Sequence, residues 1–154
     1  MASRELAGFL RALDDLIAAV PKAHRTLHVQ VVSETYRDLV ERSPVDTGAY
    51  RASHAIVDSA RRLLYDSPSR PGSDERVSDA VERPSVNDAT AALHERLEPF
   101  SRVEIENRRY YAGFLEFGTV QMAPRAIYAT AANNAKFRAE HTARFGLDLT
   151  PHLR

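Results

Sequence analysis

The sequence contains no cysteine among its 154 residues. This absence excludes a disulfide framework, cysteine-based zinc sites and thiol catalysis. No apolar run approaches the roughly 20 residues that a membrane-spanning helix needs. The first ten residues, "MASRELAGFL", carry charges inside their apolar pattern, which is unlike the core of a signal peptide. We therefore expect a protein that is made and used in the cytoplasm and has no membrane partner.

An excess of charge is missing as well. Lysine and arginine together number 21, which equals the number of aspartates and glutamates. A balanced chain has no overall field that attracts nucleic acid, so a sequence-specific nucleic-acid partner is not expected. The length is that of one domain, and it suffices to bury a core without metal or disulfide support.

Two helical patterns precede residue 43. Between residues 3 and 20, apolar side chains recur at the three- and four-residue spacing of an amphipathic helix: Leu6, Phe9, Leu10, Leu13, Leu16, Ile17 and Val20. A second pattern runs over residues 22–41, and Pro44 ends it. Pro21 lies between the two and lacks the N–H that a helix interior uses. The pattern predicts one long helix kinked near Pro21, or two stacked helices.

The stretch "SPVDTG", residues 43–48, predicts a corner. Asp46 is suited to an Asx turn, in which its side chain bonds the backbone two residues on, and Gly48 can adopt a positive φ at low cost. A strand is expected at residues 49–57. Residues 58–86 are rich in proline, serine and mixed charge, so we expect an extended loop or arm that trypsin cleaves first within residues 66–86.

The C-terminal half predicts a helix, a strand and a helix. A short helix is expected from a cap at Asn87 or Asp88 to Leu97, and a half-exposed strand over residues 101–107. Pro124 is expected to open the last helix and Gly146 to stop it, followed by an extended tail at residues 147–154. The fold class is therefore α+β: a single domain, residues 1–154, with a long N-terminal and a C-terminal helix packed on a small antiparallel sheet.

Metal and cofactor sites are not predicted. His24 and His28 have the four-residue spacing of a zinc-binding helix, but Arg25 stands where the metalloprotease pattern has glutamate. Solvent-facing histidines are the simpler interpretation, and we expect that neither zinc nor a chelator alters the melting temperature.

One residue, Glu116, is a candidate for catalysis. It lies in the stretch "YYAGFLEFGT", residues 110–119, which has four aromatic rings in eight residues. Apolar surroundings favour the protonated carboxyl group that a general acid requires. No second acid, nucleophile or metal triad is linked to Glu116 by spacing, however. We favour a structural role in which its carboxylate accepts from N–H groups of the turn at Phe117, Gly118 and Thr119.

Two segments together resemble the HK97 gp10-like family of tailed-phage neck proteins. They are "SPVDTGAYRAS", from residue 43, and "IENRRYYAGFLEFGTVQMAPRAIYATAANNAKF", from residue 105. The residues that carry the resemblance are Pro44, Val45, Asp46, Thr47, Gly48 and Arg51 in the first segment, and Asn107, Tyr111, Ala112, Leu115, Glu116, Phe117, Gly118, Thr119, Ala123 and Pro124 in the second. His54 and the reading "NRRYY" depart from the family pattern.

The resemblance implies a structural virion protein without catalysis: a tail completion or tail terminator protein at the head–tail junction. It implies a homo-oligomeric ring, commonly a hexamer, that contacts the tail tube and the head–tail connector and whose lumen passes DNA. It also implies that "YYAGFLEFGT" packs the turn between the sheet and the last helix. Because successive side chains of a strand alternate, Tyr110 and Tyr111 are expected on opposite sides of the strand end. The alternative is a small non-metal enzyme or regulatory protein that uses Glu116 and His54.

Overall fold

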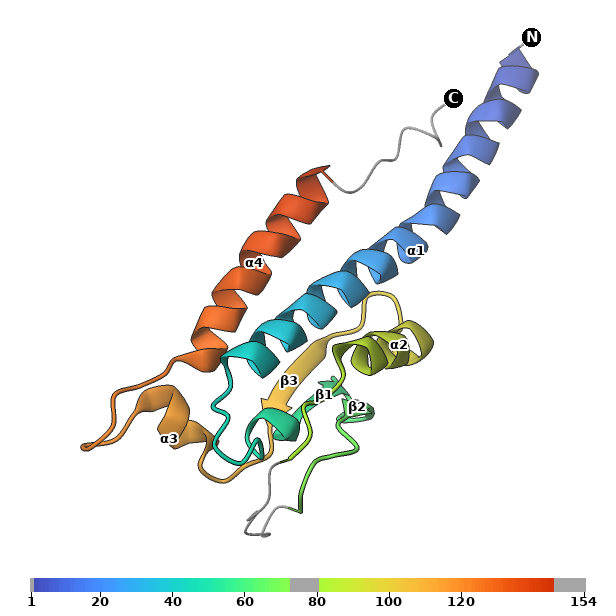
Figure 1. Ribbon diagram of the computed structural model, residues 1–154. Helices are drawn as coiled ribbons and strands as arrows, with labels where there is room; N and C mark the ends of the chain where they lie inside the picture. Colours follow the sequence, from blue (N-terminus) through green and yellow to red (C-terminus); the bar gives the residue numbers. More distant parts are fainter. Residues whose placement is uncertain (1, 73–80, 146–154) are drawn as a thin grey trace.

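The computed structural model describes residues 2–72 and 81–145, and it has the α+β architecture that the sequence predicts (Figure 1). A helix of 41 residues, α1 (Ala2–Arg42), forms the long axis of the molecule. The last helix, α4 (Ile127–Phe145), runs beside its C-terminal half, and a small sheet lies beneath the two. The predicted tail at 147–154 lies outside the described residues, as do residues 73–80 of the extended loop predicted over residues 58–86.

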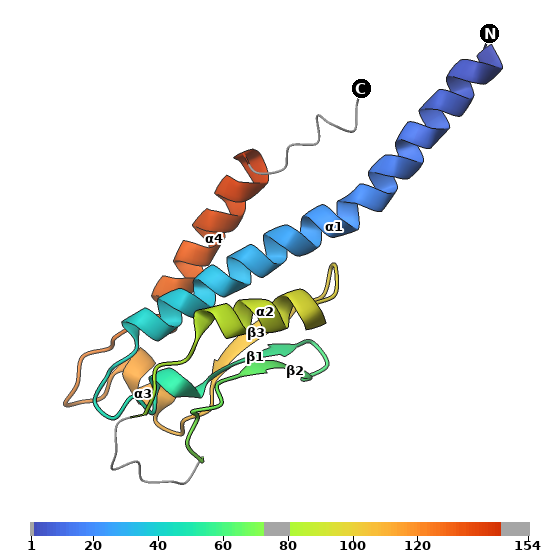
Figure 2. The ribbon, with the colours of Figure 1, turned by 45° about the vertical axis from the view of Figure 1, so that its right-hand side comes forward.

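Helix α1 continues through Pro21 rather than ending there. Figure 2 shows a single rod that bends part-way along its length, as a proline that removes one helical hydrogen bond would cause. The rod has two unlike halves. The C-terminal half is packed on the rest of the protein, with Tyr36 and Val40 fully buried. The N-terminal half, which we call the arm (residues 4–20), projects beyond the body (Figure 1).

The sheet has three antiparallel strands in the order β2-β1-β3. The central strand, β1 (His54–Asp58), is buried along its whole length. The edge strands are β2 (Leu63–Asp66) and β3 (Val103–Asn107), and β3 confirms the predicted half-exposed strand. The predicted strand at 49–57 begins too early, because Arg51–Ser53 form a short 3-10 turn, η1, in which Ser53 N–H donates to Tyr50 O at 3.1 Å.

The prediction of a loop over residues 58–86 is wrong at its start, where β1 and β2 form a hairpin. The turn is made by Asp58. Its Oδ1 accepts from the N–H groups of Ala60 and Arg62, and its Oδ2 accepts from Arg62 Nε at 2.6 Å. Arg61 holds the left-handed conformation, with φ 62. The hairpin buries Leu64 and Tyr65, which the loop prediction left in solvent.

The short helix α2 (Val86–Arg96) covers α1 and β2. Its N-cap is Ser85, whose hydroxyl accepts from Asp88 N–H at 3.1 Å. The expected caps, Asn87 and Asp88, are therefore wrong by two or three residues, and Asp88 lies instead in the first turn. A serine at this position satisfies one of the free N–H groups at the helix start.

Between β3 and α4 the chain forms a six-residue helix, α3 (Ala112–Phe117), within the aromatic stretch. Gly118 ends it with φ 77. The prediction that Pro124 opens the last helix is wrong by three residues, since α4 begins at Ile127 after Ala126 with φ 48. Helix α4 is described as far as Phe145, and the expected stop at Gly146 lies outside the described residues.

The interior consists of two apolar clusters, one on each side of α1. The larger cluster joins α1, the sheet and α2: Val29, Val32, Tyr36, Val40, Ile56, Leu64, Tyr65, Ala89, Leu93 and Leu97. The smaller cluster is formed by Leu39, Tyr50, Ile127 and Ala131, with Tyr111 and Leu115 packed on it. Among the described residues, no helix is long and apolar enough to cross a membrane.

Truncation of Leu93 tests the larger cluster. Its side chain has no exposed surface, so Leu93→Ala leaves a cavity and is expected to lower the free energy of unfolding by about 2–5 kcal/mol. The control is Leu63→Ala on the edge strand, where the leucine is 42% exposed and a loss well under half as large is expected. Urea titration measures both. Equal losses would contradict the burial described here.

Candidate functional site

The two sequence motifs meet at one corner of the molecule, between the end of α1 and the start of α3. A cavity of about 200 Å³ lies there. Its lining comes from both motifs: Pro44, Asp46, Thr47, Gly48, Ala49, Tyr50, Tyr111 and Leu115. Residues more than sixty positions apart are thus brought together, and the corner is the candidate functional site.

Gly48 is at the centre of this corner and has the positive φ that the sequence predicts, 79. A Cβ atom here would meet the carbonyl oxygen of Val81 at 2.7 Å. Val81 lies so close because its N–H donates to Thr47 O at 2.7 Å. Glycine is therefore required for two reasons: the positive φ, and the close approach of the segment that contains Val81.

The turn around Gly48 is closed by Thr47 rather than by Asp46. Thr47 Oγ1 accepts from Ala49 N–H at 3.3 Å, one residue further along the chain than the Gly48 N–H that we expected the Asp46 side chain to bond. Asp46 instead lines the cavity. Burial raises the pKa of Tyr111, and the negative charge of Asp46 adds a smaller effect in the same direction. Pro44 also lines the cavity, one residue after the buried Ser43.

Tyr50 forms the inner wall of the cavity and is 3% exposed. Burial, followed by the nearby charges of Glu116 and Tyr111, raises the pKa of Tyr50 to about 12, so it is protonated at neutral pH. Its hydroxyl oxygen is buried without a hydrogen-bond partner among the described residues. Its carbonyl accepts from Asn107 Nδ2 at 2.8 Å, which ties the corner to the end of β3.

Arg51 and Asn107 lie beside the corner rather than in its lining. Arg51 begins the 3-10 turn η1, and partial burial together with the charge of Arg83 holds its pKa below the usual range. Asn107 Oδ1 accepts from Arg109 N–H at 2.9 Å. The buried Arg109 then donates from Nε to Ser53 Oγ at 3.1 Å. Arg109 is not among the motif residues that the sequence predicted for this site, and it is 6% exposed.

Glu116 fastens α3 to the start of α4. Its two carboxylate oxygens accept from the N–H groups of Tyr128 and Ala129, each at 2.9 Å. The carboxylate is thus a cap for the first turn of α4, where N–H groups lack partners within the helix. A structural role agrees with this geometry, but the expected donors in the turn at 117–119 are wrong.

The remaining motif residues form a turn that projects from the base of α4. Thr119 and Met122 make an isolated antiparallel bridge, and Gly118 lies against it. A Cβ atom on Gly118 would meet Met122 O at 2.7 Å and Pro124 N at 2.8 Å. Phe117 points outward and is 82% exposed. Tyr110 is also exposed, whereas Tyr111 packs on the smaller cluster. Their rings meet edge to face with centroids 5.2 Å apart, so the prediction that the two tyrosines point to opposite sides is wrong.

A buried polar node centred on His54 lies behind the corner. Its Nε2 is 2.7 Å from Ser43 Oγ, and its Nδ1 is 2.7 Å from the hydroxyl of Tyr128. Ser43 Oγ donates its own proton to Leu39 O at 2.5 Å, so it accepts from His54 Nε2–H. Tyr128 and, at 3.3 Å, Asn107 Nδ2 then donate to Nδ1. This network assigns the neutral Nε2–H tautomer.

Burial lowers the pKa of His54 to about 3. A second proton at Nδ1 would face the Asn107 amide, which is also a donor, in a site with no exposed surface. His54 thus holds together the end of α1, β1, β3 and α4 as a neutral group. The enzyme hypothesis assigned chemistry to His54 and Glu116, but the structure places the first in the core and the second in a helix cap.

The paired histidines of α1 are half-buried rather than solvent-facing. His24 stacks on Phe100 with ring centroids 4.3 Å apart, and its Nδ1 accepts from Phe100 N–H at 3.2 Å. His28 lies at the edge of an apolar groove between α1 and α4, and burial lowers its pKa. Within residues 2–72 and 81–145, no group of three or more potential metal ligands comes together.

Comparison of the chain with protein-family models, with curated proteins and with solved structures gives no match in any of the three.

Substitution of Gly48 tests the corner. Gly48→Ala places a Cβ atom against Val81 O and forces a left-handed alanine, so we expect a loss of unfolding free energy of about 1–2 kcal/mol or more. Gly113→Ala is the matched control, because nothing lies within 4 Å of its Cβ position inside α3 and alanine is the better helix former. Thermal melts that shift equally for the two variants would contradict the assignment.

The neutral His54 predicts a specific loss of stability in acid. Its folded pKa, about 3, lies below the ordinary value of 6.5, so the unfolded chain binds the extra proton. The contribution is complete above pH 6.5 and falls by up to about 1.4 kcal/mol per pH unit as the pH drops toward 3. His54→Gln removes this titration, so its stability should vary less over that range than that of the exposed-site control His94→Gln. Parallel denaturation curves for the two variants would contradict the prediction.

Proposed function

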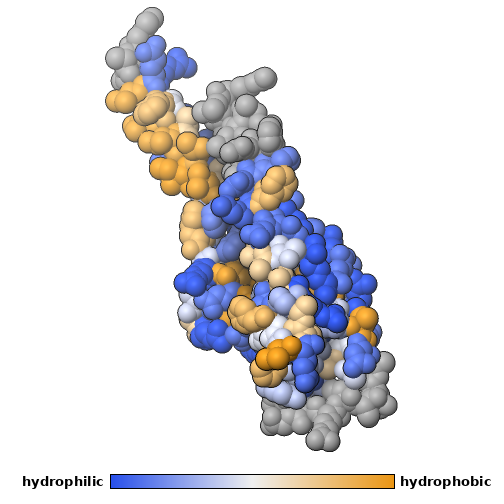
Figure 3. Space-filling view, turned by 90° about the vertical axis from the view of Figure 1, so that its left-hand side faces the viewer, coloured by the Kyte–Doolittle hydropathy of each residue, from blue (hydrophilic) through white to orange (hydrophobic). Residues whose placement is uncertain are grey.

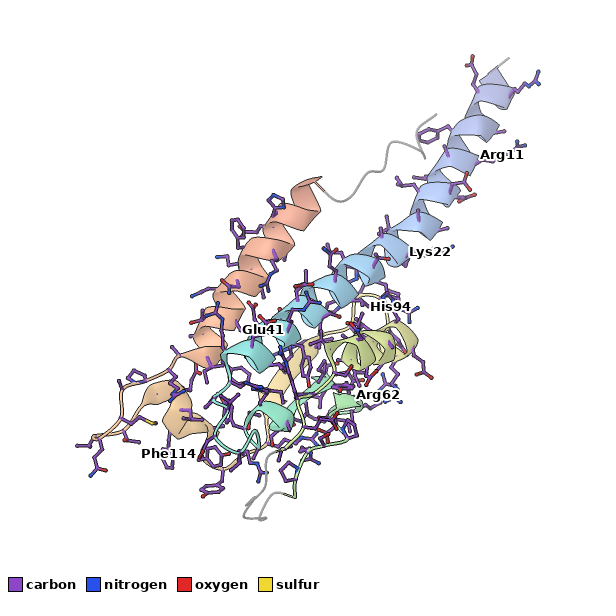
Figure 4. The ribbon with its side chains drawn as sticks, viewed as in Figure 1. Arg11, Lys22, Glu41, Arg62, His94 and Phe114 are labelled. Carbon is purple, nitrogen blue, oxygen red and sulfur yellow. The ribbon has the colours of Figure 1, made fainter. Side chains whose placement is uncertain are left out.

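We propose that this protein is a structural subunit of the head–tail neck of a tailed phage or phage-like particle, where it acts as a tail completion or tail terminator protein. The observation that carries the proposal is the placement of exposed apolar side chains at two opposite ends of an elongated subunit. Figure 4 shows these ends, with Arg11 marking the arm and Phe114 marking α3.

The lower end is the tip formed by α3 and the turn after it. Phe114, Phe117 and Val120 are 57%, 82% and 106% exposed. Apolar side chains gathered at one tip are costly to leave in water and commonly mark a contact surface. Because Glu116 and Gly118 fix the base of this tip, the contact surface is held in place before a partner arrives.

The upper end is the arm, where six large apolar side chains are at least 40% exposed. Figure 3 shows hydrophobic residues gathered along it. A subunit with exposed apolar surfaces at both ends can contact copies of itself at one end and an adjoining assembly at the other, which suits a ring that joins the tail tube to the head–tail connector. The balanced charge of 21 acidic and 21 basic residues allows copies to approach without strong repulsion.

The positions of the motifs support the same proposal. The resemblance to the HK97 gp10-like family depends on two segments that are distant in sequence, and both contribute to one corner of the fold. The alternative, an enzyme using Glu116 and His54, has less support. Both oxygens of Glu116 accept backbone N–H groups, and His54 has no exposed surface.

Deletion of the gene from a particle-producing genome tests the role. We expect filled heads and separate tails by electron microscopy, with joining restored by the intact gene supplied in trans. Phe117→Ser should melt like the parent, because Phe117 is 82% exposed, yet it should fail to restore joined particles.

Two results would contradict the proposal. One is a deletion strain that makes normal infectious particles. The other is purified protein that turns over a small-molecule substrate and loses that activity in Glu116→Gln, which would establish the enzyme instead.

A further inference from the structure

The arm carries an apolar stripe that remains exposed beside the described part of its own chain, residues 2–72 and 81–145. Leu6, Phe9, Leu10, Leu13, Ile17 and Val20 are between 40% and 64% exposed, and a contiguous exposed apolar surface of this kind commonly marks an interaction site. A lone helix of about twenty residues is marginally stable in water, since most helical stability comes from packing of the apolar face. The stripe therefore calls for a partner.

The described part of the body does not reach the stripe (Figures 1 and 2). The stripe lies on the side of α1 that faces α4 further down the rod, where Asp38 accepts from Asn134 and Arg138 and Leu39 packs on Ile127 and Ala131. Arm and body belong to one continuous helix, so the arm cannot fold back. Figures 1 and 2 both show it extending away from the sheet and from α2.

The spacing of the stripe indicates what covers it. Leu6, Phe9, Leu13, Leu16 and Val20 follow one another at intervals of three, four, three and four residues. This is the heptad period of a coiled coil, in which the partner is another helix with the same period. Leu10 and Ile17 widen the stripe beyond a two-position seam, so that one arm can contact more than one neighbour.

The flanks of the stripe favour a helix as the neighbour and disfavour a lipid surface. Ala7, Ala12 and Ala19 border it, and small side chains let two helices approach closely. The polar side of the arm has two arginines, Arg4 and Arg11, against three acids. Helices that lie on membranes are instead rich in lysine and arginine on their polar face.

We propose that the arm stripe is covered by the same stripe of a second copy of this chain, so that the arms associate as a coiled coil. A second copy of the chain carries a helix with the same heptad spacing. The small net charge of the arm limits repulsion between copies. This proposal concerns self-association and stands whether or not the protein belongs to a virion.

The absence of cysteine allows a direct test with single thiols. Leu6→Cys, Leu13→Cys and Val20→Cys place one thiol on the stripe at its two ends and near its middle. Arg11→Cys and Ala18→Cys place one on the opposite face, where both residues are exposed. Purified full-length variants are treated with a short bismaleimide, and covalent dimers are measured on denaturing gels. We expect several-fold more dimer for at least one stripe variant than for either control.

The pattern among the stripe variants separates this proposal from the ring. Dimers at all three positions show parallel arms, which a ring requires. Dimers at Leu13→Cys alone show antiparallel arms that cross near their middle, which support self-association but contradict the ring. Dimer yields equal to the controls at all three positions would overturn the proposal, as would a parent protein that stays monomeric in light scattering while its arm binds lipid vesicles.

A second measurement guards against an effect of the thiol itself. Leu13→Asp should shift the mass in light scattering from oligomer to monomer while the melting of the body is unchanged, since Leu13 is 40% exposed and outside both core clusters. Ala18→Asp is the matched control and should leave the mass unchanged. Equal masses for the two variants would also overturn the proposal.

Discussion

The imidazole of His54 lies where the end of α1, the central strand, the edge strand β3 and the last helix converge. Its Nε2–H donates to Ser43, and its Nδ1 accepts from Tyr128 and Asn107. A buried polar group is tolerated only when its hydrogen bonds are made, and here each bond comes from a different element. The position of α4 over the sheet, and of the corner before β1, thus depends on one neutral side chain.

From this node the structure extends in two directions. Tyr50 stacks edge to face on His54, with ring centroids 5.3 Å apart, and it forms the inner wall of the cavity where the two motifs meet. Tyr128, on the other side, begins the helix that Glu116 caps. The corner and the α3 tip therefore share one support, although they are more than sixty residues apart in sequence. That shared support explains why both motifs are needed to build this end of the molecule.

The sequence predicts the parts of the fold that periodicity controls. The apolar spacing in α1, the alternation in β3 and the glycine at 48 are all found as expected, because each depends on neighbours along the chain.

The β1–β2 hairpin was missed because its turn lacks the usual asparagine-glycine or aspartate-glycine pair. The Asp58 carboxylate holds Arg61 in the left-handed region instead. The partners of Glu116 were misassigned because its donors are 12 and 13 residues away, and the His54 node joins residues up to 74 positions apart. Such contacts leave no local pattern.

Helix α1 packs on the core with its C-terminal half and forms the arm with its N-terminal half. The arm and the body of the molecule are therefore mechanically coupled. Tyr36 and Val40 are buried in the body and hold the C-terminal half of the helix in place. A sideways force on the arm is therefore transmitted through the helix to this packed half. Pro21 removes one hydrogen bond from the helix between the two halves, which sets the place where the rod is most compliant. Bending is thereby directed to a point outside the packed interior, and the arm can change its direction while the cavity corner keeps its shape.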